Sequence, residues 1–239
     1  MMIQLRLLYS QKKLYNMEKL KVLIGCEESQ AITIELRKLG HEAYSCDLQD
    51  CSGGHPEWHL KMDVFKAIKL QKYGMIICHP ECTKVAISGN STYAFGKEKH
   101  NERLESAKWI QLLWDECCFV CEKVCFENPV GVLNSLTNMP VPQIVQPYEY
   151  GDAESKKTCL FLKGLPNLTP TNIVKPEYAK TKNGEIFKCK KGFKDSPTHY
   201  RTLMIKDMDE RRKQRSKTFP GIAKAMAEQW SKYILENVT

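Results

Sequence analysis

The stretch Met75-Ile76-Ile77-Cys78-His79-Pro80-Glu81-Cys82-Thr83 decides how the rest of the chain is interpreted. Its apolar start predicts a buried strand, and Pro80 ends that strand because proline cannot donate to a strand ladder. Cys82 follows on the exit loop, so a thiol is expected at the carboxyl end of the strand. In open α/β sheets ligands bind at that edge. The stretch therefore predicts a candidate thiol nucleophile at a ligand-binding edge.

Size and composition set the broad class. The chain has 239 residues, of which 42% are hydrophobic and 27% charged, enough for one sizeable core. The net charge of +8 is compatible with a polyanionic partner. No secretory signal and no run of about 20 apolar residues is found, so we expect no membrane association. The eleven cysteines are then expected to be reduced thiols in a cytoplasmic protein. Residues 1–18 are interpreted as a leader, with a single domain over 19–239.

The first part of the domain has the pattern of a nucleoside-cofactor site. A strand at Lys21–Gly25, a helix at Ala31–Leu39 and a second strand at His41–Cys46 lead to Asp47. In such units an acid at this position binds ribose hydroxyls. Only the first glycine of G-x-G-x-x-G is present, which disfavours NAD and FAD and fits S-adenosylmethionine, which has no pyrophosphate. The alternative is a βαβ unit in which Asp47 only caps a loop.

Several groups of residues are candidates for a metal site or a functional site. Cys51, His55 and His59 lack the close cysteine pairs of structural zinc sites, and we expect no metal. Cys117, Cys121 and Cys125 are expected to be buried thiols that pack as small apolar residues. The loop over residues 83–99 is long enough to be mobile or functional, with an ordinary surface excursion as the alternative.

A second functional group follows another apolar strand. Lys123–Phe126 runs directly into Glu127-Asn128-Pro129. If this strand and the Cys82 strand are neighbours, the Glu127 carboxylate lies beside the Cys82 loop. The alternative is a solvated turn.

Taken together, these segments resemble the cytosine-C5 methyltransferases, and most of all short methyltransferase-like proteins of bacteriophage genomes. Pro80-Glu81-Cys82 resembles the family's Pro-Pro-Cys loop, and Glu127-Asn128-Pro129 its Glu-Asn-Val segment. Met62-Asp63-Val64 is similar to its Gly-Asp-Ile segment, and Phe219-Pro220-Gly221-Ile222-Ala223 to its final turn and helix. Lys157 stands where the family has the first arginine of Arg-x-Arg.

The resemblance implies roles for these positions. Cys82 is the expected nucleophile, Glu127 the carboxyl group that holds the pyrimidine ring, and Lys157 a third catalytic residue. The residues expected to bind S-adenosylmethionine are Gly25, Cys26, Glu27, Ser29, Asp47, Leu48, Asp63, Val64, Pro80, Ile222 and Ala223.

Three departures from the family pattern are visible. Glu81 replaces the second proline and is expected to raise the pKa of the Cys82 thiol. The loop after Gly25 is poor in glycine. The interval from Gly164 to Ser216 is short for a target-recognition domain and predicts a small basic insertion near 165–215, irregular or forming a hairpin.

Basic residues in that insertion are candidates for phosphate contacts, although a charge run also suits a solvated face. The expected nucleic-acid-binding residues are Lys188, Lys190, Lys191, Arg211, Arg212 and Arg215.

The sequence thus predicts a single α/β domain with a mostly parallel, Rossmann-like methyltransferase sheet and helices on both faces. The resemblance implies S-adenosylmethionine-dependent methylation of cytosine C5 in DNA through a covalent Cys82 adduct, in the host cytoplasm if the chain is phage-encoded. Two alternatives stay open: a non-catalytic protein that binds nucleic acid or a protein partner, and an enzyme that modifies a free pyrimidine nucleotide.

Overall fold

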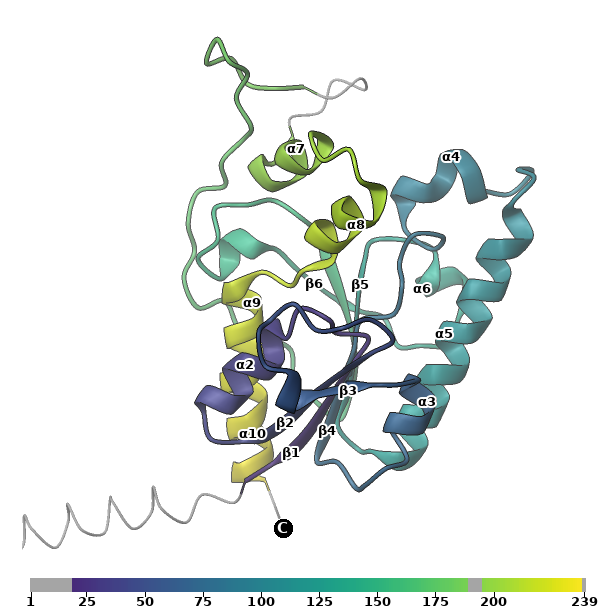
Figure 1. The fold of residues 1–239 in the computed structure, drawn as a ribbon, viewed down its shortest axis with the longest axis vertical. Coiled ribbons are helices and arrows are strands. Elements are labelled where there is room, and N and C mark those ends of the chain that lie inside the picture. The colour runs from purple at the N-terminus through teal and green to yellow at the C-terminus, as the bar shows by residue number, and fades with distance from the viewer. Residues whose placement is uncertain (1–18, 189–194, 238–239) are drawn as a thin grey trace, which may run out of the picture.

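The chain folds around one sheet of seven strands in the order β3-β2-β1-β4-β5-β7-β6 (Figure 1). The structure, a computed structural model, describes residues 19–188 and 195–237. Neighbouring strands from β3 to β5 run parallel, whereas β7 is antiparallel to both β5 and β6. The predicted mostly parallel, Rossmann-like sheet is therefore confirmed. The strands are β1 Lys21–Gly25, β2 Glu42–Asp47, β3 His59–Lys61, β4 Met75–Cys78, β5 Val124–Pro129, β6 Gln143–Val145 and β7 Thr158–Lys163.

The strand order reverses between β1 and β4. The chain leaves β1 towards β2 and β3 and then returns to place β4 on the other side of β1. At such a switch point the loops leave the sheet in opposite directions and open a crevice at the carboxyl ends of the strands. The Cys82 loop follows β4, so it lies at this crevice.

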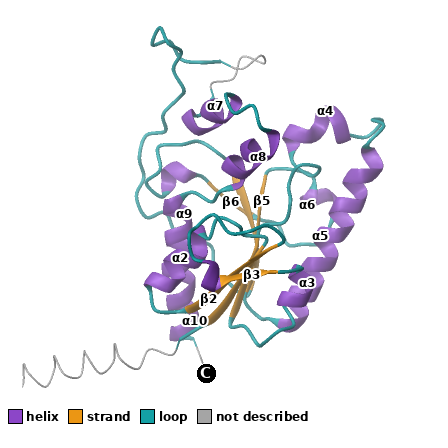
Figure 2. Cartoon of the chain, in the orientation of Figure 1, coloured by secondary structure: helices purple, strands orange, loops and turns teal. Residues whose placement is uncertain are grey.

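Helices cover both faces of the sheet, as predicted (Figures 1 and 2). Residues of α2, α9, η4 and α10 pack on one face, and residues of α3, α5 and α6 pack on the other. Short helices η1, η2, α4, η3, α7 and α8 lie in the connections. The helices are α2 Ala31–Lys38, η1 Pro56–Trp58, α3 Val64–Ala67, η2 Ile87–Gly89, α4 Asn90–Tyr93, α5 His100–Val120, α6 Leu133–Leu136, η3 Pro147–Glu149, α7 Pro197–Leu203, α8 Met208–Ser216, α9 Pro220–Ala225, η4 Met226–Trp230 and α10 Ser231–Glu236.

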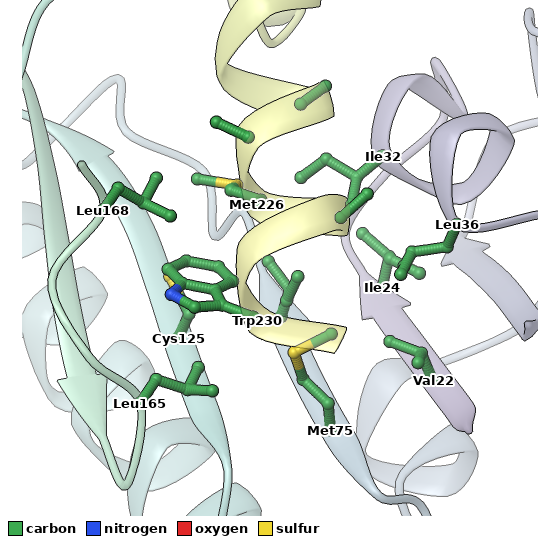
Figure 3. Packing of buried hydrophobic residues seen from close by; sticks show 14 of the residues in the cluster. Val22, Ile24, Ile32, Leu36, Met75, Cys125, Leu165, Leu168, Met226 and Trp230 are labelled. Atoms are coloured by element: carbon green, nitrogen blue, oxygen red, sulfur yellow. The ribbon is translucent and has the colours of Figure 1, made fainter. Parts of the chain in front are cut away.

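The core has two layers because alternate strand residues point to opposite faces. Ile24 of β1 packs in the layer beneath α2 and α9, whereas Leu23 packs beneath α3 and α5. Trp230 is fully buried in the first layer, and Figure 3 shows its indole among Leu165, Leu168 and Cys125. Its Nε1 donates to the carbonyl of Pro166 at 3.0 Å, so the indole's polar atom is satisfied inside the core.

The cysteines expected to be core residues are buried. Cys117 and Cys125 are inaccessible to solvent and Cys121 is 5% exposed. The prediction that these cysteines are buried and pack as small apolar residues is confirmed. Within the two described ranges, no helix is long and apolar enough to cross a membrane.

The region after β7 differs in part from the expectation. Residues 165–188 are largely irregular, with one isolated bridge between Lys180 and Ile186. The expectation of an irregular segment or hairpin is wrong for the following part, which contains α7 and α8. Ser196 caps α7 by accepting from the His199 amide, and Pro197 takes the first turn, where its missing N–H costs nothing. The expected leader, residues 1–18, lies outside the described residues.

Gly25, the last residue of β1, packs against the other strands too closely for a side chain. A Cβ there would lie 2.8 Å from both Cys78 Sγ and Val64 Cγ2. Because both contacts are core side chains, we expect Gly25→Ala to lower the free energy of unfolding by about 1–3 kcal/mol. Urea denaturation followed by circular dichroism measures this change.

Gly74 provides the matched control at the other end of the sheet. A Cβ there would meet Leu20 Cδ2 at 3.4 Å and the Lys21 carbonyl at 3.7 Å, ordinary van der Waals distances. Gly74→Ala should therefore change the stability by less than about 1 kcal/mol. Equal effects of the two substitutions would contradict the packing described for Gly25.

Candidate active site

The centre of the site is a buried pair formed by His79 and Glu127. Strands β4 and β5 are parallel neighbours with Cys78 opposite Phe126, so His79, the first residue after β4, lies beside Glu127, which is still in β5. His79 Nδ1 lies 2.9 Å from Glu127 Oε2, and the two side chains are 10% and 13% exposed. The predicted position of the Glu127 carboxylate beside the Cys82 loop is confirmed, and the alternative of a solvated turn is wrong.

Asn128 fixes the Cys82 loop to the end of β5. Its Nδ2 donates to the Pro80 carbonyl at 2.8 Å, while the His79 amide donates to the Gly25 carbonyl at 2.9 Å. The loop is thereby held to both neighbouring strands. Two buried polar atoms here, His79 Nε2 and Asn128 Oδ1, have no hydrogen-bond partner among the described residues. Such atoms are uncommon in folded proteins and are expected where a ligand binds.

The Cys82 thiol is partly buried and is protonated at neutral pH. Burial has the largest effect in raising the pKa of this thiol, and the negative charge of Glu127 raises it further. The positive charge of Lys156 acts in the opposite direction. Glu81 contributes to the increase, as the sequence predicted, but its effect is smaller than that of burial and of Glu127.

Lys156, rather than Lys157, carries the positive charge that reaches this group. The charge of Lys156 lowers the pKa values of Cys82, Glu127 and His79. Its Nζ donates to the Arg215 carbonyl at 2.9 Å and lies 5.8 Å from the centre of the Phe219 ring. Lys157 is exposed, immediately before β7. The sequence analysis therefore identified the right segment, but the charge comes from Lys156 and not from the expected Lys157.

Arg103 holds the chain that follows Cys82. This α5 side chain is 3% exposed, and it donates to the carbonyls of Lys84 and Ala86 and to Asn90 Oδ1. The loop over residues 83–99 therefore begins as a fixed segment and continues into η2 and α4. These contacts favour the alternative in which this loop is a functional part of the site over that of an ordinary surface excursion.

The loop after β1 forms the expected turn without glycine. Cys26 and Gln30 have left-handed backbones, with φ of 57° and 59°. Gln30 is fully buried, and its side chain bonds to Ser45, to the His55 carbonyl and to the His55 amide. These bonds offset the strain of a non-glycine residue in this conformation, about 1–2 kcal/mol. The turn is therefore held by side-chain hydrogen bonds of Gln30 and not by glycine.

The carboxylates expected to bind a cofactor differ in how many of their oxygens are already hydrogen-bonded within the fold. Both oxygens of Glu27 are used within the fold, by the Ile32 amide at 2.8 Å and the Thr33 hydroxyl at 2.7 Å. Asp47 ends β2, and its Oδ1 accepts from the Gln49 amide. Asp63 caps α3 by accepting from the Phe65 amide. Asp47 and Asp63 keep an oxygen for a ligand, whereas Glu27 serves the start of α2.

The other expected cofactor residues also separate into two groups. Ile222 and Ala223 are 1% exposed and lie in the core layer with Ile32 and Leu36, so they pack rather than line a cavity. Gly25 and Val64 are likewise buried in the sheet and α3. The remaining expected residues, which retain some solvent exposure or adjoin the Cys82 loop, are Cys26, Ser29, Leu48 and Pro80.

Helix α8 lies over the carboxyl edge of the sheet (Figure 1). Its Lys213 Nζ is 3.5 Å from Glu28 Oε2, and Glu28 is only 7% exposed in the loop after β1. The Lys156 bond to the Arg215 carbonyl joins the same helix to the Cys82 group. The basic helix is thus anchored to both halves of the crevice.

The expected nucleic-acid contacts are only partly available. The Arg211 guanidinium donates to the carbonyls of Leu203 and Ile205 and so closes the end of α7. The side chains of Lys188, Arg212 and Arg215 are exposed. Lys190 and Lys191 lie outside the described residues.

Neither surface hollow found in the described residues contains the Cys82 group. Two open hollows of about 440 and 500 Å³ border α2, one against η1 and the other against α9. In the same part of the chain, no group of three or more His, Cys, Asp or Glu side chains could hold a metal ion. The candidate site is therefore identified by its chemistry and its place in the sheet.

The comparisons with known proteins leave the function open. No protein-family model and no curated protein matches the chain. The solved structures similar to the chain include three of WbdD. The medium-resolution structure of the bifunctional kinase-methyltransferase WbdD has 12% identity and a TM-score of 0.39 over 64% of this chain and 36% of that one. The high-resolution crystal structure of WbdD has 10% identity and a TM-score of 0.38 over 74% and 42%, and WbdD with the kinase inhibitor LY294002 has 11% and 0.39 over 82% and 48%. The chain thus spans less than half of each, and a similarity this distant carries no conclusion about activity.

The charges around Cys82 make its reactivity predictable. Glu127→Gln removes a charge that raises the thiol pKa, so alkylation by iodoacetamide at pH 8 should become several-fold faster. Lys156→Gln removes a charge that lowers this pKa and should make alkylation slower. Mass spectrometry of the Cys82 peptide measures both rates, and equal rates in the two variants and the unmodified protein would contradict the described electrostatics.

The role of Arg103 can be tested separately. A lysine cannot reach all three acceptors with a fixed planar fork, so Arg103→Lys should cost about 1–3 kcal/mol of stability. Amide exchange should accelerate at Val85, Ala86 and Gly89, which bond within this loop. Lys108→Ala, at an exposed position of the same helix, is the control that should leave both quantities unchanged. Unchanged exchange in Arg103→Lys would show that the loop is held by other contacts.

Proposed function

We propose that this chain is an S-adenosylmethionine-dependent methyltransferase that acts on C5 of cytosine in DNA through a covalent Cys82 adduct. The observation that supports it most is the juxtaposition of Cys82 and Glu127 at the carboxyl ends of two adjacent parallel strands, next to the switch point of the sheet. The family resemblance assigns a nucleophile and a ring-holding carboxyl group to these two positions.

The residues suit the chemistry of the first step. C5 of cytosine is a poor nucleophile, and addition of a thiolate at C6 makes it electron-rich. Cys82 supplies the sulfur, and its proton must leave as the substrate binds because the resting thiol has a raised pKa. The Glu127 carboxyl group holds ring N3 and the exocyclic amine, and the buried surroundings strengthen these hydrogen bonds. Removal of the C5 proton then allows the thiolate to be eliminated.

The carboxyl ends of β1, β2 and β3 fit the cofactor. Asp47, with one oxygen available after its bond to Gln49, is suited to ribose hydroxyls, and Asp63 lies one strand further along. The turn at Cys26 brings the backbone to the same edge without the glycines of the family. S-adenosylmethionine supplies an electrophilic methyl group when bound. Ile222 and Ala223 would support this region from the core.

A non-catalytic role in binding nucleic acid is the second candidate. The raised pKa of Cys82 favours it, because a protonated thiol is a poor nucleophile. Exposed Lys188 and Arg215 would then hold phosphates without base chemistry.

Covalent trapping separates these candidates. With S-adenosylmethionine present, a duplex that contains 5-fluorocytosine should form a stable adduct with the protein, because fluorine at C5 cannot leave as a proton. Cys82→Ser should abolish the adduct, and Cys118→Ser, at a partly buried cysteine of α5, should leave it unchanged. An adduct with 5-fluorodeoxycytidine monophosphate but not with DNA would instead identify a nucleotide-modifying enzyme.

Cofactor binding is tested independently by calorimetry. Asp47→Asn should weaken S-adenosylmethionine binding about tenfold or more, since it replaces a charged acceptor of ribose hydroxyls by a neutral group. If the unmodified protein neither binds S-adenosylmethionine nor forms the adduct, the proposed enzyme is excluded and the binding role remains.

A further inference from the structure

We propose that His79 is a positioning residue that holds Glu127 and supplies it with the proton that Glu127 passes to the substrate ring. This inference rests on the proposed function, because it concerns how the same site handles a proton. It assigns a role to a residue outside the set that the family resemblance identifies. The residue acts through Glu127 and need not touch the substrate.

The geometry commits the His79 ring to Glu127. The register of β4 and β5 places the two residues side by side, and the Nδ1–Oε2 distance of 2.9 Å is that of a strong hydrogen bond. The other ring nitrogen, Nε2, is buried and has no partner in the described part of the chain. No second contact therefore competes for the orientation of the ring.

The charges that face His79 come from three elements. Glu127 at the end of β5 and Glu27 in the loop after β1 favour the imidazolium, whereas Lys156 before β7 disfavours it. Glu27 is fixed by its bonds to Ile32 and Thr33. Although burial acts against the charged ring, the two carboxylates raise the pKa of His79, and His79 together with Lys156 lowers the pKa of Glu127. These directions favour the ionised form of the pair, an imidazolium and a carboxylate.

The ionised pair creates a requirement for the reaction. A carboxylate accepts hydrogen bonds but cannot donate one to N3, which is itself an acceptor in cytosine. The proton on Nδ1 is already in a hydrogen bond with Oε2, so it can move to Glu127 as N3 approaches the carboxyl group. His79 then becomes neutral.

The proton is conserved through the cycle. The proton of the Cys82 thiol leaves to solvent, and as the resulting thiolate forms its bond to C6, a second proton passes from His79 through Glu127 to N3. When the C5 proton has been removed and the bond between sulfur and C6 breaks, the N3 proton returns to the pair. No further reactant is needed for this transfer.

His79→Asn tests the proposal, because an asparagine amide can keep a donor near the position of Nδ1 but cannot give up a proton. Adduct formation and methylation by the unmodified protein should fall as the pH rises through the raised pKa of His79. We expect the variant to be about 10²-fold slower, with little change in KM and without that descending limb. His41→Asn replaces another buried histidine, at the start of β2, and should keep the limb.

A second measurement does not depend on activity. NMR titration of the His79 ring should give a pKa above the ordinary value for histidine, and Glu127→Gln should bring it down. An unchanged rate and pH profile in His79→Asn, or a His79 ring that titrates normally in the unmodified protein, would overturn the inference. Absence of any adduct in a protein whose His79 titrates as expected would instead overturn the proposed function, and the delivery to N3 with it.

Discussion

The parallel pairing of β4 with β5 is the constraint on which the candidate site depends. It places His79, the first residue after β4, beside Glu127 of β5, and both side chains are almost out of contact with water. A buried ion pair is stable only when both partners are present, since removal of either leaves an unpaired charge that costs about 3–5 kcal/mol. The same pairing lets Asn128 hold the Pro80 carbonyl and so determines where Cys82 lies. The position of the thiol is therefore a consequence of strand register.

The sheet and its helices could be predicted because their signals are local. The apolar strand before Cys82 and the βαβ pattern up to Asp47 follow from periodicity, and both are present. The position of Glu127 needed only the assumption that two strands are neighbours. Helix α7 was predictable in principle, since Ser196 and Pro197 form a standard helix start within a segment that composition alone made appear irregular.

The remaining parts of the site depend on tertiary contacts that spacing does not encode. His79 reads as one more residue of a strand end, and only the register of β5 gives it a partner. Arg103 lies among charged residues at the start of a long helix, where nothing in the sequence separates a buried arginine from a solvated one. Which of two adjacent lysines faces Cys82 depends on how the chain enters β7. In the opposite way, a pattern in the sequence can suggest a site residue where there is none. Ile222 and Ala223 were expected to bind a cofactor because of their order along a family pattern, but they are core residues.

The charges of the site also explain how a thiol beside acidic residues can be kept ready for reaction. The Glu127 carboxylate raises the pKa of the Cys82 thiol even though it is paired with His79. Lys156 has no carboxylate partner among the described residues, and its bond to the Arg215 carbonyl leaves its positive charge uncompensated. The charge of Lys156 opposes that of Glu127 and favours a thiolate at Cys82, although burial keeps the resting thiol protonated. If a substrate takes the proton held by the pair, Glu127 is again an unpaired carboxylate, and Lys156 is the group that offsets it. Lys156 thus offsets negative charge in both steps. Its hydrogen bond to the Arg215 carbonyl connects this charge to the basic helix α8.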